Sequence, residues 1–347
     1  MSKSLQIDFL AVNSGEKSGD AIAFRYGDFS SRATQKVVVI DGGTLNAGAE
    51  LAKLIETHYG TTHVDLVICT HPDADHASGL REILRLCSVG ELWLHKPWDH
   101  SEHICHLFHD GRITDNSLSE RLKDAYNFAH ELQQIAEEKN IDVREPFAGR
   151  EFDNGAILVL GPDVDYYREL VPNFARSPEA KSLLEKAFST LAAKATNWIE
   201  ETFNIETLDD SGTTSSENLS SAVILLTFEG EKFLFTGDAG MESLHKVLEY
   251  AEANNIDLSK VSFMQAPHHG SKRNISPAIL DAIKCDTAYI SASKESDKHP
   301  SKKVINAFIR RGAQVFSTEG NGLVHQRNCS RGWGAATQHQ FYYQVEA

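Results

Sequence analysis

The chain has 347 residues, 16 of them histidine and five cysteine, and a formal charge of −15. This length can bury a large core, whereas the acidic balance opposes non-specific attraction to polyanions by the field of the whole molecule. The five cysteines are scattered and odd in number, which favours reduced thiols and a cytoplasmic location. No apolar run is long enough to span a bilayer and the N-terminus lacks a signal peptide, so we expect no membrane contact.

The first third of the chain alternates apolar β-like runs with helical periodicity. The predicted strands are 6–12, 21–26, 36–41, 64–69 and 91–95, and the predicted helices are 47–58 and 77–86. Residues 219–325 repeat this alternation, which indicates a second half of the same α/β (α+β) class. Its predicted strands are 219–228, 232–236, 260–264, 286–291, 314–317 and 322–325, with helices at 240–252, 277–284 and 301–311.

Residues 100–217 lie between the two halves and do not follow their pattern. Helical stretches are predicted at about 117–138 and 178–200, a β-like segment near 151–160, and a loop at 201–217. We expect one domain over 1–347 in which 100–217 is an insert, positioned to act as a lid over a binding site.

The most informative segment follows the predicted strand 64–69. Two histidines and two aspartates, His71, Asp73, Asp75 and His76, occur within six positions. A turn at a strand end lets such side chains converge, and their burial together would be very costly without a cation. The alternative is a solvated turn in which Asp75 or His76 caps the helix that follows.

Two later strands end in further metal-binding residue types. Thr-Gly-Asp follows the strand 232–236 and supplies Asp238, and Pro-His-His-Gly-Ser follows the strand 260–264 and supplies His268 and His269. With these motifs the chain resembles the metallo-β-lactamase superfamily, whose first motif is usually His-x-His-x-Asp-His. The aspartate at 73, the Pro-His-His-Gly-Ser run and His299-Pro300 resemble the hydrolase domain of ComEC-type competence proteins, here without a membrane channel, and the related choline-phosphate esterases.

The resemblance implies an αββα sandwich with a helical insert and two divalent metal ions between its halves. Asp75, His76, Asp238 and one of His268 or His269 would hold one ion, for which we take His269. His71, Asp73 and the bridging Asp238 would hold the other. The loop 217–221 lacks the histidine that most members supply, so Asn218 or water would take its place. This oxygen-rich set admits Mn²⁺ or Mg²⁺ as well as Zn²⁺.

The resemblance also implies a metal-dependent hydrolase, most concretely a phosphodiesterase or nuclease that uses a hydroxide held between two metal ions. Asp75, His268 and His299 are the expected catalytic residues, the histidines as ligands of a phosphoryl oxygen or as proton donors to the leaving group. DNA or another phosphodiester is the expected substrate. Nine basic against four acidic residues in 271–311 suggest a rim that guides phosphates, although a solvated helix face would have the same composition.

Two other functions remain open from the sequence. One is hydrolysis of a small phosphorylated molecule or another ester, which the acidic chain favours. The other is a weakly active metal-binding subunit with partner proteins, for example in a defence system. The histidines from His95 to His109 are not expected to form a second metal site, because no carboxylates or thiolates complete one. Only His95 is expected near the substrate, because it ends a strand on the same edge as the metal motif. Asp20 and Asp41 are expected to support the ligands or to form turns.

Overall fold

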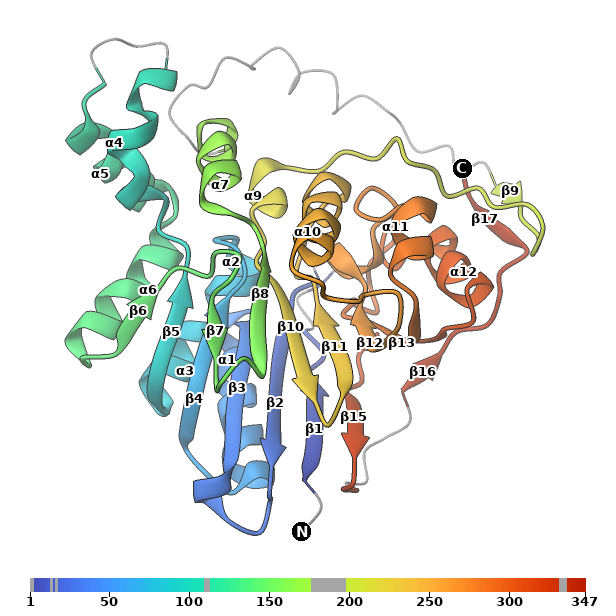
Figure 1. Cartoon of the computed structure of the whole chain (residues 1–347), viewed down its shortest axis with the longest axis horizontal. Helices are drawn as coiled ribbons and strands as arrows, with labels where there is room; N and C mark the ends of the chain where they lie inside the picture. The colour runs from blue at the N-terminus through green and yellow to red at the C-terminus, as the bar shows by residue number, and fades with distance from the viewer. Residues whose placement is uncertain (1–2, 13–14, 16–17, 109–112, 176–197, 331–335) are drawn as a thin grey trace.

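The computed structural model describes residues 3–12, 15, 18–108, 113–175, 198–330 and 336–347. Two sheets lie face to face, with helices on the outer side of each (Figure 1). In spatial order, the first sheet consists of β15 (Leu323–Arg327), β1 (Ser4–Phe9), β2 (Ala21–Gly27), β3 (Gln35–Gly42), β4 (His63–Cys69), β5 (Ser88–Leu94) and β6 (Asp142–Arg144). This arrangement confirms the predicted αββα sandwich.

The second sheet is built mainly from the later half of the chain. In spatial order it consists of β16 (Thr337–Gln338), β14 (Gln314–Ser317), β13 (Cys285–Ile290), β12 (Val261–Gln265), β11 (Glu231–Phe235), β10 (Val223–Phe228), β8 (Ile157–Gly161) and β7 (Glu151–Phe152). A separate pair, β9 (Trp198–Glu200) and β17 (Gln344–Glu346), lies beside α12 (Figure 1).

Helices cover both outer faces of the sandwich. Those of the first half and the middle segment are α1 (Leu45–Leu54), α2 (Ala74–Ala77), α3 (Leu80–Leu86), α4 (Ser101–Ile104), α5 (Asp115–Ala125), α6 (Asn127–Glu138) and α7 (Val164–Leu170). Those of the second half are α9 (Ser216–Leu219), α10 (Met241–Ala253), α11 (Pro277–Ala282) and α12 (Lys302–Arg310). Among the described residues, no helix is both long and apolar enough to cross a membrane.

The side-chain alternation of the strands explains the layers. In β2 the large Ile22 and Phe24 point into the core between the sheets, whereas Ala21 and Ala23 point to the helical side. Side chains on alternate positions of a strand face opposite sides of a sheet, so small residues on one face let α1 approach closely. Aromatic stacking of Phe24 on Phe235, at 5.4 Å and 10°, joins the two sheets.

Three predicted segments differ from the structure. The strand at 322–325 was expected in the second half, but β15 pairs with β1 in the first sheet, where Leu323 faces Phe9. The predicted strand 219–228 begins only at Val223, because Ser215 caps the short helix α9 through Asn218 N–H. The predicted helix 178–200 lies largely outside the described residues, and its described end, 198–200, is the strand β9.

The middle segment 100–217 contributes to the sandwich itself. Its strand β6 extends the first sheet beside β5, and β8 pairs with β10 in the second sheet. The helical stretch 117–138 is two helices, α5 and α6, which meet at Tyr126. The action of this segment as a lid stays a prediction.

Candidate metal centre

The motif residues meet where strands of both sheets end. His71 and His76 follow β4 in the first sheet, Asp238 follows β11, and His268 and His269 follow β12 in the second sheet. The carbonyl oxygen of Thr70, directly after β4, accepts a hydrogen bond from Ala222 N–H at 2.9 Å, just before β10. This bond fixes the ends of the two sheets beside each other, so their loops share one site.

The Asp238 carboxylate lies at the centre of four imidazoles. It is 4 % exposed, and His71, His76 and His269 are equally buried. Distances from its oxygens to the surrounding Nε2 atoms are 3.5 Å for His76, 3.7 Å for His268, 3.8 Å for His71 and 3.9 Å for His269. These spacings exceed a hydrogen bond and leave room for ions between the carboxylate and the rings.

Asp41 orients two of these rings. His76 donates its Nδ1 proton to Asp41 Oδ2 at 2.8 Å. The Thr70 hydroxyl donates to the same oxygen at 2.6 Å, so it can accept a hydrogen bond from His71 Nδ1, which lies 3.0 Å away. With both Nδ1 protons committed, the Nε2 lone pairs of His71 and His76 are directed at Asp238. Such hydrogen bonds commonly set the tautomer of metal-binding histidines.

Asn274 has the same effect on His268. Its amide nitrogen donates to the main-chain oxygen of Asp238 at 2.9 Å, which turns its Oδ1 toward His268 Nδ1 at 3.1 Å. When it bonds Asn274, His268 donates from Nδ1 and faces Asp238 with its Nε2. The amide nitrogen of Asn218 lies 3.1 Å from the same Nδ1 and donates to it in the other tautomer. Asn218 stands at the loop position where the resemblance predicts a missing histidine.

The polar atoms of this centre fit divalent metal ions. Within the described residues, no hydrogen bond reaches His71 Nε2, His76 Nε2, Asp238 Oδ1 or either ring nitrogen of His269. Donor atoms of Asp75, His76 and His269 lie within 4.8 Å of one another, as do those of Asp20, His76 and Asp238. Buried lone pairs that face a carboxylate without donors are very unfavourable unless a cation lies between them.

The two aspartates of the first motif are both half-buried and lie near different ligands. Asp75 belongs to the cluster with His76 and His269, as the predicted ligand set for one ion requires. Asp73 has Oδ2 3.8 Å from His71 Nε2, on the side predicted for the other ion. Asp41 also groups with His71 and His76, but its hydrogen bonds to Thr70 and His76 engage both its oxygens.

The backbone around the centre adopts conformations that most residues avoid. His268 and His269 have positive φ values of 47° and 57°, and Gly270 follows with 76°. Consecutive left-handed residues other than glycine are unfavourable, and such conformations concentrate at functional sites. Gly237, before Asp238, has a φ of 50°, and a Cβ there would lie 3.0 Å from the Thr70 hydroxyl.

The charges of the centre are strongly coupled. Burial raises the pKa of Asp238, but His268, His76 and His269 outweigh burial and hold it well below its usual range. Burial also raises the pKa of Asp20, whose Oδ2 accepts a hydrogen bond from Gln265 at 2.7 Å. His299 lies with its ring 5.4 Å from that of His268, and burial together with His268 and His269 lowers its pKa to about 3.

Neutral His299 changes one expectation for the site. The proton-donor role assumed a histidine pKa near 6.5, whereas a pKa of about 3 keeps the ring uncharged at neutral pH. Nearby cations would favour the uncharged ring further. Its Nδ1 is buried without a hydrogen-bond partner among the described residues, so Nε2 is the ring atom left to bind a phosphoryl oxygen through a hydrogen bond.

The sequence did not single out Thr70 and Asn274, because neither belongs to a metal-ligand pattern. Thr70 has a weak signal, since it directly precedes His71 at the end of a strand. His95 is 2 % exposed and stacks on Tyr167 at 4.5 Å and 22°. His100 bonds Glu145 at 3.0 Å, which agrees with a structural role, and His109 lies outside the described residues.

Comparison with known proteins identifies the family. A model of the metallo-beta-lactamase superfamily matches residues 32–294, which is most of the chain. The chain belongs to this superfamily of metal-dependent hydrolases, as the motifs predicted. The fold, with its clusters of histidine and aspartate, implies divalent metal ions.

A more specific similarity supports the ComEC-like resemblance. ComE operon protein 3 of Bacillus subtilis is 30 % identical over 118 residues, or 34 % of this chain and 15 % of that protein. The chain thus matches less than a fifth of that relative's length. Among solved structures, a metal-dependent hydrolase of the beta-lactamase superfamily aligns with 92 % of this chain and 98 % of its own at 14 % identity and a TM-score of 0.44. A diphosphatase of the PhnP family aligns with 94 % and 99 % at 11 % identity and a TM-score of 0.42.

Proposed function

We propose that the chain is a metal-dependent phosphodiesterase that cleaves DNA. The main support is the Asp238 carboxylate surrounded by four imidazole Nε2 atoms, together with the two aspartates of the first motif. This donor set provides two neighbouring places for divalent ions, with Asp238 between them. Asp75, His76, Asp238 and His269 would hold one ion, and His71, Asp73 and Asp238 the other.

Two divalent ions held together supply positive charge at the attacking and leaving oxygens of a phosphodiester and activate water for attack. The chain's own residues hold and align these ions. Asp41 and Thr70 fix the rings of His71 and His76, so the ligands need not reorganise when an ion binds. Preorganisation of this kind favours tight binding with a defined spacing between the ions.

Two histidines would meet the substrate on the side of the second sheet. His299 is neutral and its Nδ1 is buried, so its Nε2 would donate the hydrogen bond to a phosphoryl oxygen. The side chain of His268 is 28 % exposed, its ring lies 5.4 Å from that of His299, and its Nε2 lies 3.7 Å from Asp238. Its exposed side would face the substrate, as we expect of a catalytic residue that is not the main metal ligand.

The test is cleavage of end-labelled single- and double-stranded DNA by purified protein with Mn²⁺, Mg²⁺ or Zn²⁺. Asp75→Asn should abolish the cutting, and Asp124→Asn, on the exposed side of α5, should retain it. Metal-loaded protein that leaves DNA intact but hydrolyses a small phosphate ester would instead support a small-molecule phosphoesterase. Metal binding without turnover of either substrate would support a metal-binding subunit that requires a partner protein.

A further inference from the structure

A pocket of about 420 Å³ is lined by three basic side chains, Lys272, Arg273 and Lys303. We call it the basic pocket. The loop 207–213 forms its other wall and contributes hydroxyl groups, among them those of Ser211 and Thr213. Ammonium, guanidinium and hydroxyl groups around one cavity are the donors that bind phosphate in proteins.

Two of the basic side chains of the pocket make no direct contact with an acidic group. Lys303 is only 8 % exposed, and its side chain makes no ion pair or hydrogen bond with another described residue. The guanidinium of Arg273 likewise has no such partner among the described residues. The Lys303 ammonium is not among the buried atoms that lack a partner, so the buried part of the side chain is its stem and the charge faces the pocket. Both charged groups are therefore available to an anion that enters the pocket.

The acidic groups nearby offset part of this positive charge through electrostatic interactions of Asp209 and Glu346 with the lysines, but they make no direct contact with them. Asp209 lines the pocket, but its Oδ1 accepts hydrogen bonds from the main chain and hydroxyl of Ser211. Lys272 donates a hydrogen bond to the main-chain oxygen of Ala347 at 2.5 Å. Glu346 is directed elsewhere, toward Ser301 and the N-terminus of α12.

Three chain segments connect the basic pocket to the metal centre. Lys272 follows His269 by three residues, so their Cα atoms are at most about 11 Å apart. Lys303 follows His299 by four residues, in the first turn of α12. On the third side, Thr214 follows the pocket loop and accepts a hydrogen bond from Asn218, which contacts His268.

We propose that the basic pocket binds a second backbone phosphate of the nucleic acid whose scissile phosphate lies at the metal centre. This inference rests on the proposed function. Phosphates recur about every 3.4 Å along the axis of a strand, so a strand held at the metal centre would present further phosphates to a pocket only a few residues along the chain. The pocket would then give an acidic protein local affinity for a polyanion and favour strands over substrates with one phosphate.

The experiment measures the salt dependence of binding to a labelled phosphorothioate oligothymidylate of twelve nucleotides, which resists hydrolysis, by fluorescence anisotropy of metal-loaded protein. Each phosphate contact contributes about 0.7 to the slope of log K against log salt for a single strand. The double variant Arg273→Gln/Lys303→Gln should lower the slope by about 0.7, for the one phosphate that the pocket holds, and weaken binding at least tenfold, as for the loss of a charge-assisted hydrogen bond.

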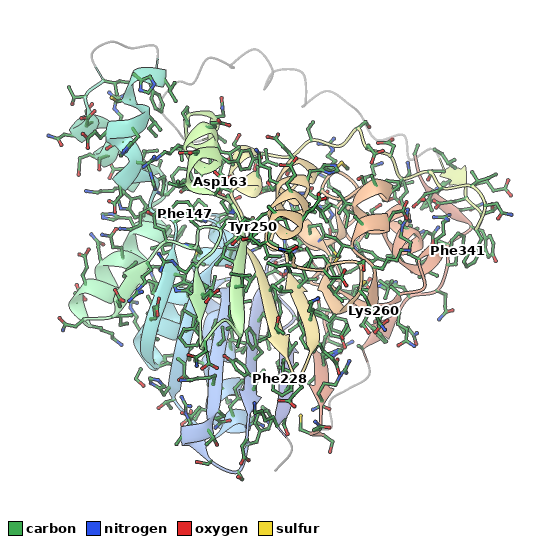
Figure 2. The ribbon with its side chains drawn as sticks, in the orientation of Figure 1. Phe147, Asp163, Phe228, Tyr250, Lys260 and Phe341 are labelled. Atoms are coloured by element: carbon green, nitrogen blue, oxygen red, sulfur yellow. The ribbon has the colours of Figure 1, made fainter. Side chains whose placement is uncertain are left out.

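A matched control uses a second pocket, of about 440 Å³, whose lining includes Lys232 and Lys260 together with Glu231 and Asp286. Lys260, labelled in Figure 2, precedes β12, at the opposite end of this strand from His268. Lys260→Gln should leave the slope unchanged. All variants should hydrolyse bis(p-nitrophenyl) phosphate, which has one phosphate, at the wild-type rate, and this readout also shows that the metal centre has folded.

The outcomes separate this inference from the proposed function. An unchanged slope in the double variant overturns the pocket as a phosphate site, whether or not the protein cuts DNA. An equal loss with the one-phosphate substrate also overturns it, because the substitutions would then act through the metal centre. Wild-type protein that binds the oligonucleotide through this pocket but cuts no DNA would reject the nuclease and retain the phosphate site.

Discussion

Asp41→Asn should weaken metal binding without a change to any metal ligand. Asp41 accepts three hydrogen bonds, from Thr70 N–H at 2.8 Å, the Thr70 hydroxyl at 2.6 Å and His76 Nδ1 at 2.8 Å. An asparagine can keep the bond from Thr70 N–H, but its amide nitrogen would then face the other two donors. His76 relieves this conflict by moving its proton to Nε2, where it can no longer bind a metal ion.

The expected loss is a factor of 10 to 100 in metal affinity, the usual effect when a carboxylate behind a metal-binding histidine is removed. This corresponds to about 1.4 to 2.8 kcal/mol. The loss should exceed that of a Thr70→Val variant, because Thr70 acts on His71 alone. Isothermal titration of the metal-free protein with Zn²⁺ and Mn²⁺ measures both affinities, and elemental analysis gives the ion content.

Asp65→Asn is the matched control, because Asp65 is also an aspartate of the first sheet that accepts a main-chain hydrogen bond, from Val37 at 2.9 Å, and it pairs with Arg32. It should lower the free energy of unfolding and leave metal affinity unchanged. Unchanged affinity in Asp41→Asn would refute the orientation argument. An affinity loss of the same size in Asp65→Asn would also refute it, because the loss of metal affinity would then result from the lower stability of the fold.

Four further predictions follow from the geometry. Gly237→Ala should cost about 1 to 2 kcal/mol in backbone strain and also weaken metal binding, whereas Gly230→Ala, with φ of 83° and no atom within 4 Å, should show only the strain in urea unfolding. Burial lowers the pKa of His95 to about 3, so the unfolded chain takes up a proton below pH 6.5 and stability falls as the pH drops toward 3; His95→Phe should reduce this slope by up to about 1.4 kcal/mol per pH unit in urea titrations with chelator. His269→Ala should lose about one ion per chain by elemental analysis, whereas His268→Ala should keep its ions and lose turnover; the reverse pattern would exchange their roles. Metal at a hundredfold excess over its Kd should raise the free energy of unfolding by about 2.7 kcal/mol over the chelated protein, and an equal melting curve in both would contradict binding to the native state.

The periodicity of the sequence predicts most of the strands and helices, and the resemblance to the superfamily supplies their arrangement as a sandwich. The periodicity fails where tertiary pairing decides the outcome. The run 322–325 has the same pattern as the strands before it, and only its pairing with β1 assigns it to the first sheet. In the same way, the strands β6 and β8 belong to the sheets through their neighbours, although the surrounding segment has no regular alternation.

The residue types at the site were readable from the sequence because metal-binding side chains cluster after strands. The residues that orient these side chains through hydrogen bonds were harder to find in the sequence. A threonine before a histidine and an asparagine six residues after His268 occur in many proteins without such roles. Thr70 and Asn274 orient His71 and His268 only because each makes one hydrogen bond in a particular direction. That direction depends on how the two sheets meet.

Histidines that surround Asp238 are held by a hydrogen bond at Nδ1 on both sides of the centre, although the two sheets share no sequence motif there. In the first sheet Asp41 and Thr70 take the Nδ1 protons of His76 and His71, and in the second Asn274 takes that of His268. Each arrangement leaves an Nε2 that faces Asp238. Burial lowers the pKa of His76, but in the metal-free chain Asp238 and Asp41 outweigh burial and raise this pKa well above its usual range. A proton therefore takes the place of a cation there and must leave when an ion binds. The hydrogen bonds around the site therefore link folding to metal binding, and variants of these supporting residues should change both together.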